Sequence, residues 1–185
     1  MFTHQITPDL ELRLLQPSDA ASLFCIVDGH RSYLREWLPW VDEMVKLPDA
    51  QKFIARRLRD NSETKAFTAG IWSGGQLVGA IGHNRIDWKN RMANPGWWLL
   101  PEAQGKGIMT QCCKVVFAHA FNQLSIDRIC VGVATENLRG QTIVKRLGFM
   151  QVSTLRRAER LRGRSVDHYI YSLASPSARP PTELI

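Results

Sequence analysis

The chain has 185 residues, of which 44% are hydrophobic and six are tryptophan. This composition excludes an intrinsically disordered protein and favours one globular domain with a single core. The net charge of +7 suits an anionic ligand, an acidic protein partner or nucleic acid. No apolar run approaches the roughly 20 residues of a membrane span. The first residues show no basic and apolar signal regions, so we expect a cytoplasmic protein that has no membrane partner.

The basic residues and the cysteines argue against a nucleic-acid-binding protein and a metal-binding protein. One dense basic cluster contains Arg156, Arg157, Arg160, Arg162 and Arg164. No nucleic-acid recognition motif accompanies it, so a solvated basic hairpin is favoured over a nucleic-acid site. The four cysteines lack the spacing of metal ligands, and no metal site is predicted. They are interpreted as small core residues in a reducing compartment.

The first half of the chain predicts a strand, two helices and a strand meander. Residues 10–14 alternate apolar and charged side chains, which predicts a strand. Ser18 is predicted to cap the helix that follows. The segment Trp37-Leu38-Pro39-Trp40 is expected to end a short helix at its proline, and Pro48 to open the next helix. The meander comprises strands at 67–72, 77–82 and 96–100, with a hairpin turn at 73–76 and a polar connection at 86–94.

The second half predicts alternating helices and strands. Apolar residues recur at helical spacing after Gly107, and residues 128–133 read as a buried strand. A helix is predicted after Asn137, which is a candidate for its N-cap. The helix is expected to end at Gly148, in a left-handed backbone conformation. A last hairpin joins residues 149–158 to 166–173. The proline-containing tail, residues 175–185, is expected to be disordered.

The turn between the strand at 96–100 and the next helix carries the strongest chemical signal. Gly105 and Gly107 lie where the helix begins, and Lys106 stands between them. Free amides and the positive dipole at a helix N-terminus bind anions, and glycine lets a phosphate approach the backbone. The spacing does not fit a Walker loop. A dinucleotide fingerprint would require glycine where Thr110 stands.

Three motifs in order resemble one family. The segment Gln104-Gly105-Lys106-Gly107 resembles the pyrophosphate loop of the GCN5-related N-acetyltransferases (GNAT), although Met109 departs from the small residue usual there. Residues 137–149 look like the family's second motif. Residues 158–163, followed by Asp167-His168 and Tyr171, resemble the final hairpin of the RimJ/RimL branch. The alternative is an ordinary turn whose glycines serve packing.

The resemblance implies an α/β protein with the GNAT acyl-CoA N-acyltransferase fold. Its sheet is mixed and mostly antiparallel, with helices on both faces and two splayed central strands. The domain is expected at residues 9–174. The implied activity is acetyl-CoA-dependent transfer of an acetyl group to a primary amine, with a ribosomal-type protein N-terminus as the expected acceptor. Alternatives are a small amine such as a polyamine, antibiotic or amino-acid conjugate, or a non-catalytic CoA-binding module. Relatives are often homodimers.

The resemblance also assigns site residues. The implied acetyl-CoA contacts are Trp98, Leu99, Leu100, Gln104, Gly105, Lys106, Gly107, Ile108, Met109, Thr110 and Asn137. The amide near Leu99 would face the thioester oxygen. For Asn137 the alternative role is a helix cap, and both roles can coexist. Trp37 and Trp40 are expected near the acceptor.

Proton transfer is the less defined part of the implied site. Glu159 is the expected base, acting through water, and its alternative is a surface glutamate paired with arginines. Deprotonating an α-amine of pKa about 7.8 at pH 7 costs about 1 kcal/mol, against about 4.6 kcal/mol for a lysine. A weak base therefore suits an N-terminal amine. The usual donors to the thiolate are replaced by Val144 and Gly140, and Thr142 lies nearby in sequence.

Overall fold

Residues 2–176, the part of the chain that the computed structural model describes, are organised around one eight-stranded sheet. Its strand order is β1-β2-β3-β4-β5-β6-β8-β7, and every neighbouring pair is antiparallel except β5 with β6. The strands are β1 (Thr3–Thr7), β2 (Leu10–Leu14), β3 (Phe67–Ser73), β4 (Gln76–Asp87), β5 (Met92–Leu99), β6 (Arg128–Ala134), β7 (Met150–Leu161) and β8 (Arg164–Ala174). The predicted mixed, mostly antiparallel sheet is confirmed.

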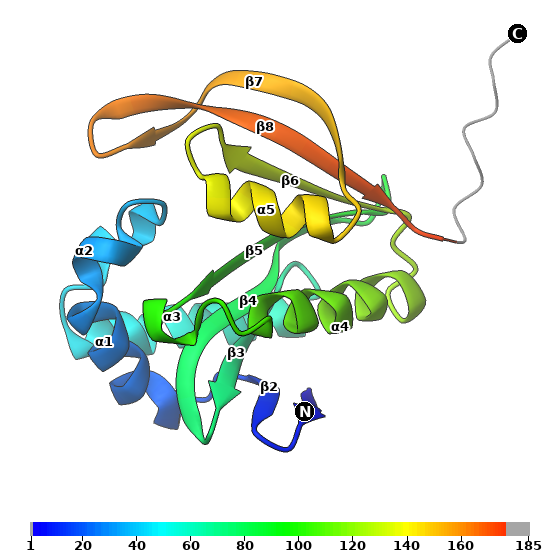
Figure 1. Ribbon diagram of the computed structural model, residues 1–185. Helices are drawn as coiled ribbons and strands as arrows, with labels where there is room; N and C mark the ends of the chain where they lie inside the picture. The colour runs from blue at the N-terminus through cyan, green and yellow to red at the C-terminus, as the bar shows by residue number, and fades with distance from the viewer. Residues whose placement is uncertain (1, 177–185) are drawn as a thin grey trace, which may run out of the picture.

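Helices cover both faces of the sheet (Figure 1). One face carries α4 (Ile108–Asn122) and α5 (Leu138–Arg146), and the other carries α1 (Ala20–Gly29), α2 (Arg31–Leu34) and α3 (Leu47–Ser62). Short 3-10 turns η1 (Pro17–Asp19), η2 (Pro39–Glu43) and η3 (Pro101–Ala103) connect them. Each face has its own buried cluster. Leu99 belongs to the cluster under α4 and its neighbour Leu100 to the other, as the two-residue period of a strand requires.

Several predicted boundaries are wrong in the first half of the chain. The polar connection at 86–94 is instead strand at both ends, because Ile86 and Ala93 are buried partners of the β4–β5 ladder. The exposed polar residues between Ile86 and Ala93 are the reason that the sequence predicted a connection there and not a strand pairing. Strand β1 was not predicted, since it is a polar edge strand with mostly exposed side chains. Pro39 begins η2 and does not end a helix, because α2 already stops at Leu34.

The predicted cap of the first helix is also wrong. Asp19, not Ser18, organises this turn: its carboxylate accepts a hydrogen bond of 2.8 Å from the Gln16 amide and pairs with Arg13 at 3.0 Å. A carboxylate satisfies a free amide better than a hydroxyl does. Cys25 is exposed, so the prediction of core cysteines fails there and holds for Cys112 and Cys113.

The end of the domain lies slightly later than predicted. Ser175 is buried, and its amide donates to the carbonyl of Asp127 at 2.8 Å. The predicted disorder is therefore wrong at that residue. Residues 177–185, to which the rest of that prediction applies, lie outside the described residues.

The two central strands separate. Strands β5 and β6 pair only at Met92 with Arg128 and at Ala93 with Ile129. Beyond those pairs β6 continues along β8, and β5 continues along β4. The Leu100 amide donates to Val78 of β4 at 2.8 Å, so by antiparallel alternation the amide of Leu99 faces the gap. The predicted splay of the sheet is confirmed.

Candidate active site

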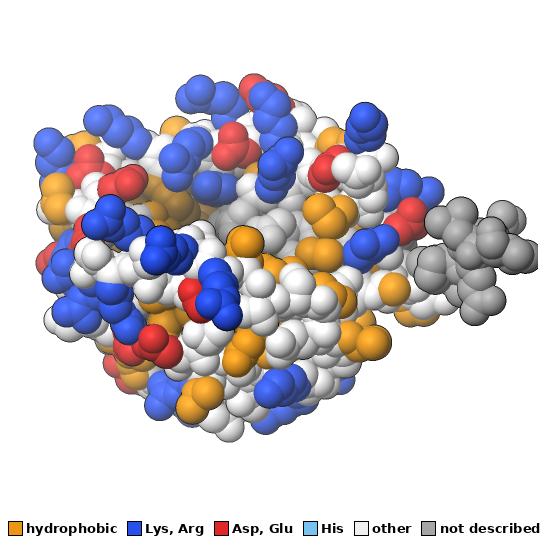
Figure 2. Space-filling model, turned by 90° about the horizontal axis from the view of Figure 1, so that it is seen from above, with side chains coloured by type: hydrophobic (Ala, Val, Ile, Leu, Met, Phe, Trp, Pro, Cys, Tyr) orange, Lys and Arg blue, Asp and Glu red, His pale blue; other side chains and the backbone are white. Residues whose placement is uncertain are grey.

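Two adjoining cavities lie at this gap. The larger, of about 900 Å³, lies between the end of β5, the start of α4 and α5. The smaller, of about 630 Å³, lies between α3, η2 and the β7–β8 hairpin. Residues that line both are Trp37, Leu38, Trp97, Trp98, Asn137 and Gly140. Viewed from the β7–β8 side, the molecule is hollowed, with hydrophobic side chains at depth and many Lys and Arg side chains around the rim (Figure 2).

The glycine turn has a backbone geometry that is compatible with an anion-binding site. Gly105 and Gly107 both have φ of 75°, in the left-handed region that favours glycine. A Cβ added at Gly105 would meet nothing within 4 Å, and one at Gly107 only the Gln111 side chain at 3.9 Å. Gly107 is the N-cap of α4, and it supplies no side-chain cap. Backbone conformation therefore requires these glycines, while the space above them is open to a ligand.

The Gln104 side chain braces the turn through hydrogen bonds to three other residues. Its Nε2 donates to the Leu99 carbonyl at 3.1 Å and to the Tyr33 hydroxyl, and its Oε1 accepts from Arg139 Nη1 at 2.8 Å. It thus ties β5 to α2 and to the start of α5. Sequence reasoning missed Tyr33, which carried no signal. Arg139 stood two residues after Asn137, and that proximity was the available signal.

The other predicted cofactor contacts also line the larger cavity. They are Trp98, Leu99, Ile108, Met109, Thr110 and Asn137 together with the two glycines. Lys106 is exposed at the turn. Leu100 is not brought there: it is buried in the cluster on the other face, and its amide is bonded to β4. Arg146, not predicted, adds a second cation to the lining.

Asn137 serves as the predicted helix cap. Its Oδ1 accepts a 2.9 Å hydrogen bond from the Gly140 amide at the start of α5. A Cβ on Gly140 would lie 2.9 Å from the Val133 side chain and 3.1 Å from that of Asn137. Close packing explains the glycine here. Val144 is fully buried, and Thr142 lines the larger cavity with its hydroxyl bonded to the Leu138 carbonyl at 2.9 Å.

Aromatic side chains wall the smaller cavity. Trp40 stacks on Phe53 of α3 at 5.5 Å between ring centroids, and lies 6.1 Å from Trp98. Trp37 lines both cavities and Trp40 only the smaller one. The structure therefore brings Trp40 to the cavity away from the glycine turn, and it places Trp37 where the two cavities adjoin.

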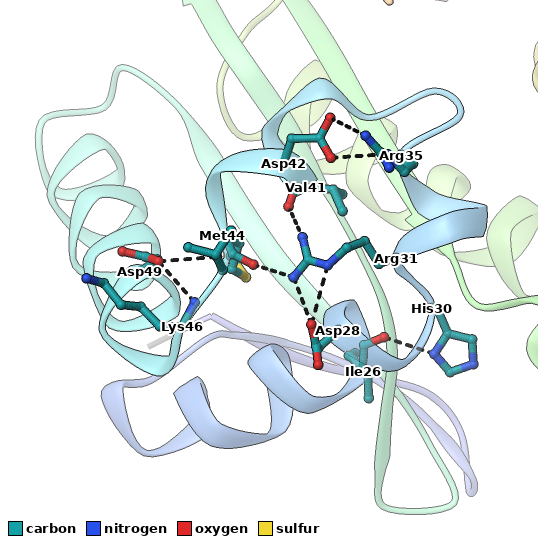
Figure 3. A network of polar contacts seen from close by, with 11 residues as sticks. Ile26, Asp28, His30, Arg31, Arg35, Val41, Asp42, Met44, Lys46 and Asp49 are labelled. Atoms are coloured by element: carbon teal, nitrogen blue, oxygen red, sulfur yellow. Dashed lines mark hydrogen bonds and ion pairs between the residues drawn. The ribbon is translucent and has the colours of Figure 1, made fainter. Parts of the chain in front are cut away.

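A polar network fixes this wall (Figure 3). Arg31 of α2 donates to the carbonyls of Val41 at 2.5 Å and Met44 at 2.6 Å, and it pairs with Asp28 at 2.9 Å. Nearby, Arg35 pairs with an aspartate of η2 at 3.2 Å. Charged donors to backbone carbonyls are strong hydrogen bonds, so this network holds the turn after Trp37 in place. Sequence reasoning did not identify it.

Another cross-link joins α1 to the approach to the glycine turn. His30 Nε2 lies 2.8 Å from Glu102 Oε1. The hydrogen bond to Glu102 raises the pKa of His30, and the carbonyl of Ile26 adds to this effect. The contact ties the end of α1 to η3, directly before Gln104.

Charges are sparse in the smaller cavity. Its lining includes Glu159, Arg56 and Arg57 as the charged side chains among the described residues, beside His168. Burial lowers the pKa of Arg57, and the neighbouring Arg56 lowers it further. Both guanidinium groups lie near the Phe53 ring, at 5.6 and 5.9 Å from its centroid. Glu159 lines this cavity and lies 3.4 Å from His168.

Residues 2–176 carry the features of neither a metal site nor a membrane-spanning helix. There, no group of three or more His, Cys, Asp or Glu side chains is arranged to hold a metal ion. Among the same residues, no helix is both long and apolar enough to cross a membrane.

Comparison with known proteins gives the family. A family model described as an acetyltransferase (GNAT) domain matches residues 9–150. The "Putative ribosomal N-acetyltransferase YdaF" of Bacillus subtilis (strain 168) is 28% identical over 174 residues, which cover 94% of this chain and 95% of that protein. The ribosomal-protein-serine acetyltransferase of Escherichia coli (strain K12) is 24% identical over 170 residues, covering 92% and 95%.

A solved structure matches the fold closely. RimL, an alpha-N-protein acetyltransferase in complex with coenzyme A, superposes with a TM-score of 0.90 at 22% identity, covering 94% of this chain and 98% of that one. The gap in the sheet and the open glycine turn provide the features that an acyl-CoA requires. The chain therefore belongs to the GNAT acetyltransferase family, in its RimJ/RimL branch, as an acetyl-CoA-dependent N-acetyltransferase.

Proposed function

We propose that the acceptor is the α-amine of a protein N-terminus, of the ribosomal-protein type. The observation that carries this proposal is the charge of the smaller cavity, whose lining among the described residues holds one carboxylate, Glu159, and two arginines, Arg56 and Arg57. A polyamine is a polycation and would need several carboxylates to replace its hydration. A peptide brings one ammonium group and a neutral or acidic chain, which this lining tolerates.

The relatives support the same acceptor class. Two of them carry names that refer to ribosomal acetylation, and each aligns over nearly the whole chain. The adjacency of the two cavities, which share lining residues at the gap, supports it as well, because a peptide N-terminus must approach from one side while the thioester approaches from the other.

In the proposed arrangement, the amides at the start of α4 bind the diphosphate of acetyl-CoA, with Lys106, Arg139 and Arg146 adding positive charge. The pantetheine arm follows Trp98 and Leu99 along the gap, with the Asn137 side chain beside it. The Leu99 amide donates to the thioester oxygen and stabilises the negative charge that develops there.

In the proposed reaction, the acetyl group moves from the sulfur of CoA to the nitrogen of the acceptor amine. The amine nitrogen forms a bond to the thioester carbon, and the carbon–sulfur bond breaks, so that CoA leaves with the electron pair. Before this attack, Glu159 takes one proton from the acceptor ammonium group, directly or through water, and releases it to solvent, which leaves a neutral amine with a free electron pair. The nitrogen loses its second proton to water after the attack, and the thiolate takes its proton from water, because neither the hydrocarbon side chain of Val144 nor Gly140 can donate one.

An acceptor panel tests the proposal. Purified protein, acetyl-CoA and short peptides with free N-termini should release CoA with a higher kcat/KM than spermidine or N-terminally blocked lysine peptides. The blocked peptides are the matched control for lysine acetylation. A preference for spermidine would overturn the proposed acceptor. CoA binding without turnover of any amine would instead indicate a CoA-binding module.

A further inference from the structure

Strand β7 has an irregularity beside Glu159. Leu155 pairs with His168 and Glu159 pairs with Val166, so four steps along β7 match two steps along β8. Arg157 within this bulge has φ of 48°, and its amide donates to Asp167 Oδ1 at 2.8 Å. Bulges re-aim the side chains that follow them. Asp167 therefore stabilises the backbone irregularity that precedes Glu159.

His168, the neighbour of Asp167, contacts Glu159 itself. Its Nε2 is buried, makes no hydrogen bond among the described residues, and lies 3.4 Å from Glu159 Oε2. The ring lies against β6 at Gly132, where an added Cβ would stand 2.9 Å from Nδ1. A glycine in the middle of a buried strand thus makes room for this imidazole, which lines the smaller cavity.

We propose that Asp167 and His168 are positioning residues for the acetyl transfer, and that they act through Glu159. This inference rests on the role given to Glu159 in the proposed function. A buried nitrogen without a partner is costly, and a rotation that shortens the 3.4 Å contact satisfies it. His168 then holds one carboxylate oxygen of Glu159 and leaves the other for the acceptor ammonium. Asp167 fixes the backbone from which Glu159 projects.

Among the described residues, the lining of the smaller cavity offers His168 no carboxylate other than that of Glu159. Arg56 and Arg57 on α3 are the other charged groups in the lining of this cavity. Strand β6 presents apolar residues and Gly132 there, α5 presents Asn137 and Gly140, and the Asp167 carboxylate is engaged by Arg157.

A double-mutant cycle tests the proposal. His168→Gln should lower kcat about tenfold on a peptide acceptor, with less than a twofold change in the KM for acetyl-CoA. His168→Leu should lose more, because glutamine retains an N–H donor and leucine does not. In a Glu159→Gln background, His168→Gln should cause no further loss, since interacting residues are not additive. His4→Gln, at an exposed position on β1, is the control.

The other possible results of the double-mutant cycle contradict the inference, the proposed acceptor, or both. If the two losses multiply, His168 does not act through Glu159 and the proposal is overturned. If His168→Gln does not fold, Asp167→Asn and Asp167→Ala replace it. Asparagine keeps the oxygen that accepts from the Arg157 amide, so only the alanine variant should lower kcat. In a Glu159→Gln background, Asp167→Ala should cause no further loss of kcat. The cycle is run on peptides and on small primary amines. Turnover of small amines alone contradicts the proposed acceptor, whereas a multiplicative cycle contradicts only this inference. If no amine is turned over, both are contradicted.

Discussion

Arg139 Nη1 and Gln104 Oε1 lie 2.8 Å apart in the lining of the larger cavity, although the two residues are 35 positions apart in the sequence. The contact joins the first turn of α5 to the residue that precedes the glycine turn. Through its amide nitrogen, Gln104 is also bonded to Leu99, at the end of β5. One amide side chain therefore connects three elements that surround the predicted cofactor site.

We predict that Arg139→Gln weakens CoA binding about tenfold, because it removes both a cation near the diphosphate and the brace on Gln104. Isothermal titration with CoA measures the loss. Lys114→Gln removes one charge from the exposed side of α4 and is the matched control. Equal losses in the two variants would show that only the net charge matters.

Gly107→Ala should weaken CoA binding tenfold or more. Its φ of 75° is unfavourable for alanine by about 1 to 2 kcal/mol, so relaxation of the turn moves the amides at the start of α4. Gly148→Ala is the control, because Gly148 has φ of 84° and open space around its Cβ but lies at the end of α5. Both variants should lose similar stability on thermal unfolding. Unchanged CoA affinity in Gly107→Ala would remove the turn from the cofactor site.

His83 predicts a pH dependence of stability. It is fully buried on β4. Burial lowers its pKa to about 4, and nearby His119 lowers it slightly, while the carbonyl of Val116 opposes both. Below pH 6.5 the unfolded chain therefore binds a proton that the folded chain does not, and stability falls as the pH drops from 6.5 to about 4.

Substitution isolates that contribution. His83→Leu should gain stability relative to the parent protein by roughly 3 kcal/mol between pH 6.5 and pH 4, from the pKa difference. Denaturant unfolding at several pH values measures it, and subtracting the two proteins cancels the shared carboxylates. A stability difference that stays constant with pH would contradict the buried neutral imidazole.

We predict that the expected homodimer forms through strand β7. It is an edge of the sheet, and three of its apolar side chains are exposed, Met150 by 72%, Val152 by 58% and Leu155 by 54%. A two-fold axis can pair such an edge with a second copy of itself. Analytical ultracentrifugation should show a dimer that Val152→Lys dissociates, while Val45→Lys, at an exposed site before α3, leaves it intact. A monomeric parent protein would refute this interface.

The sequence predicted those parts that depend on local patterns. The glycine turn, the Asn137 cap and the order of most strands follow from spacing and from residue preferences at helix ends. The contacts that span the fold could not be predicted in this way. Arg31 reaches the Val41 carbonyl of η2, and His168 meets Glu159 only because a bulge and a glycine bring them together. Such pairings depend on tertiary register, which no local pattern encodes.

The most direct test of the account is a crystal structure of the protein with CoA. We predict the diphosphate within hydrogen-bond distance of the amides of residues 105–109, and the pantetheine in the gap between β5 and β6 with its thiol near Leu99 and its amides beside Asn137. CoA bound away from the glycine turn, or a gap closed by continuous pairing of β5 with β6, would contradict the central claim.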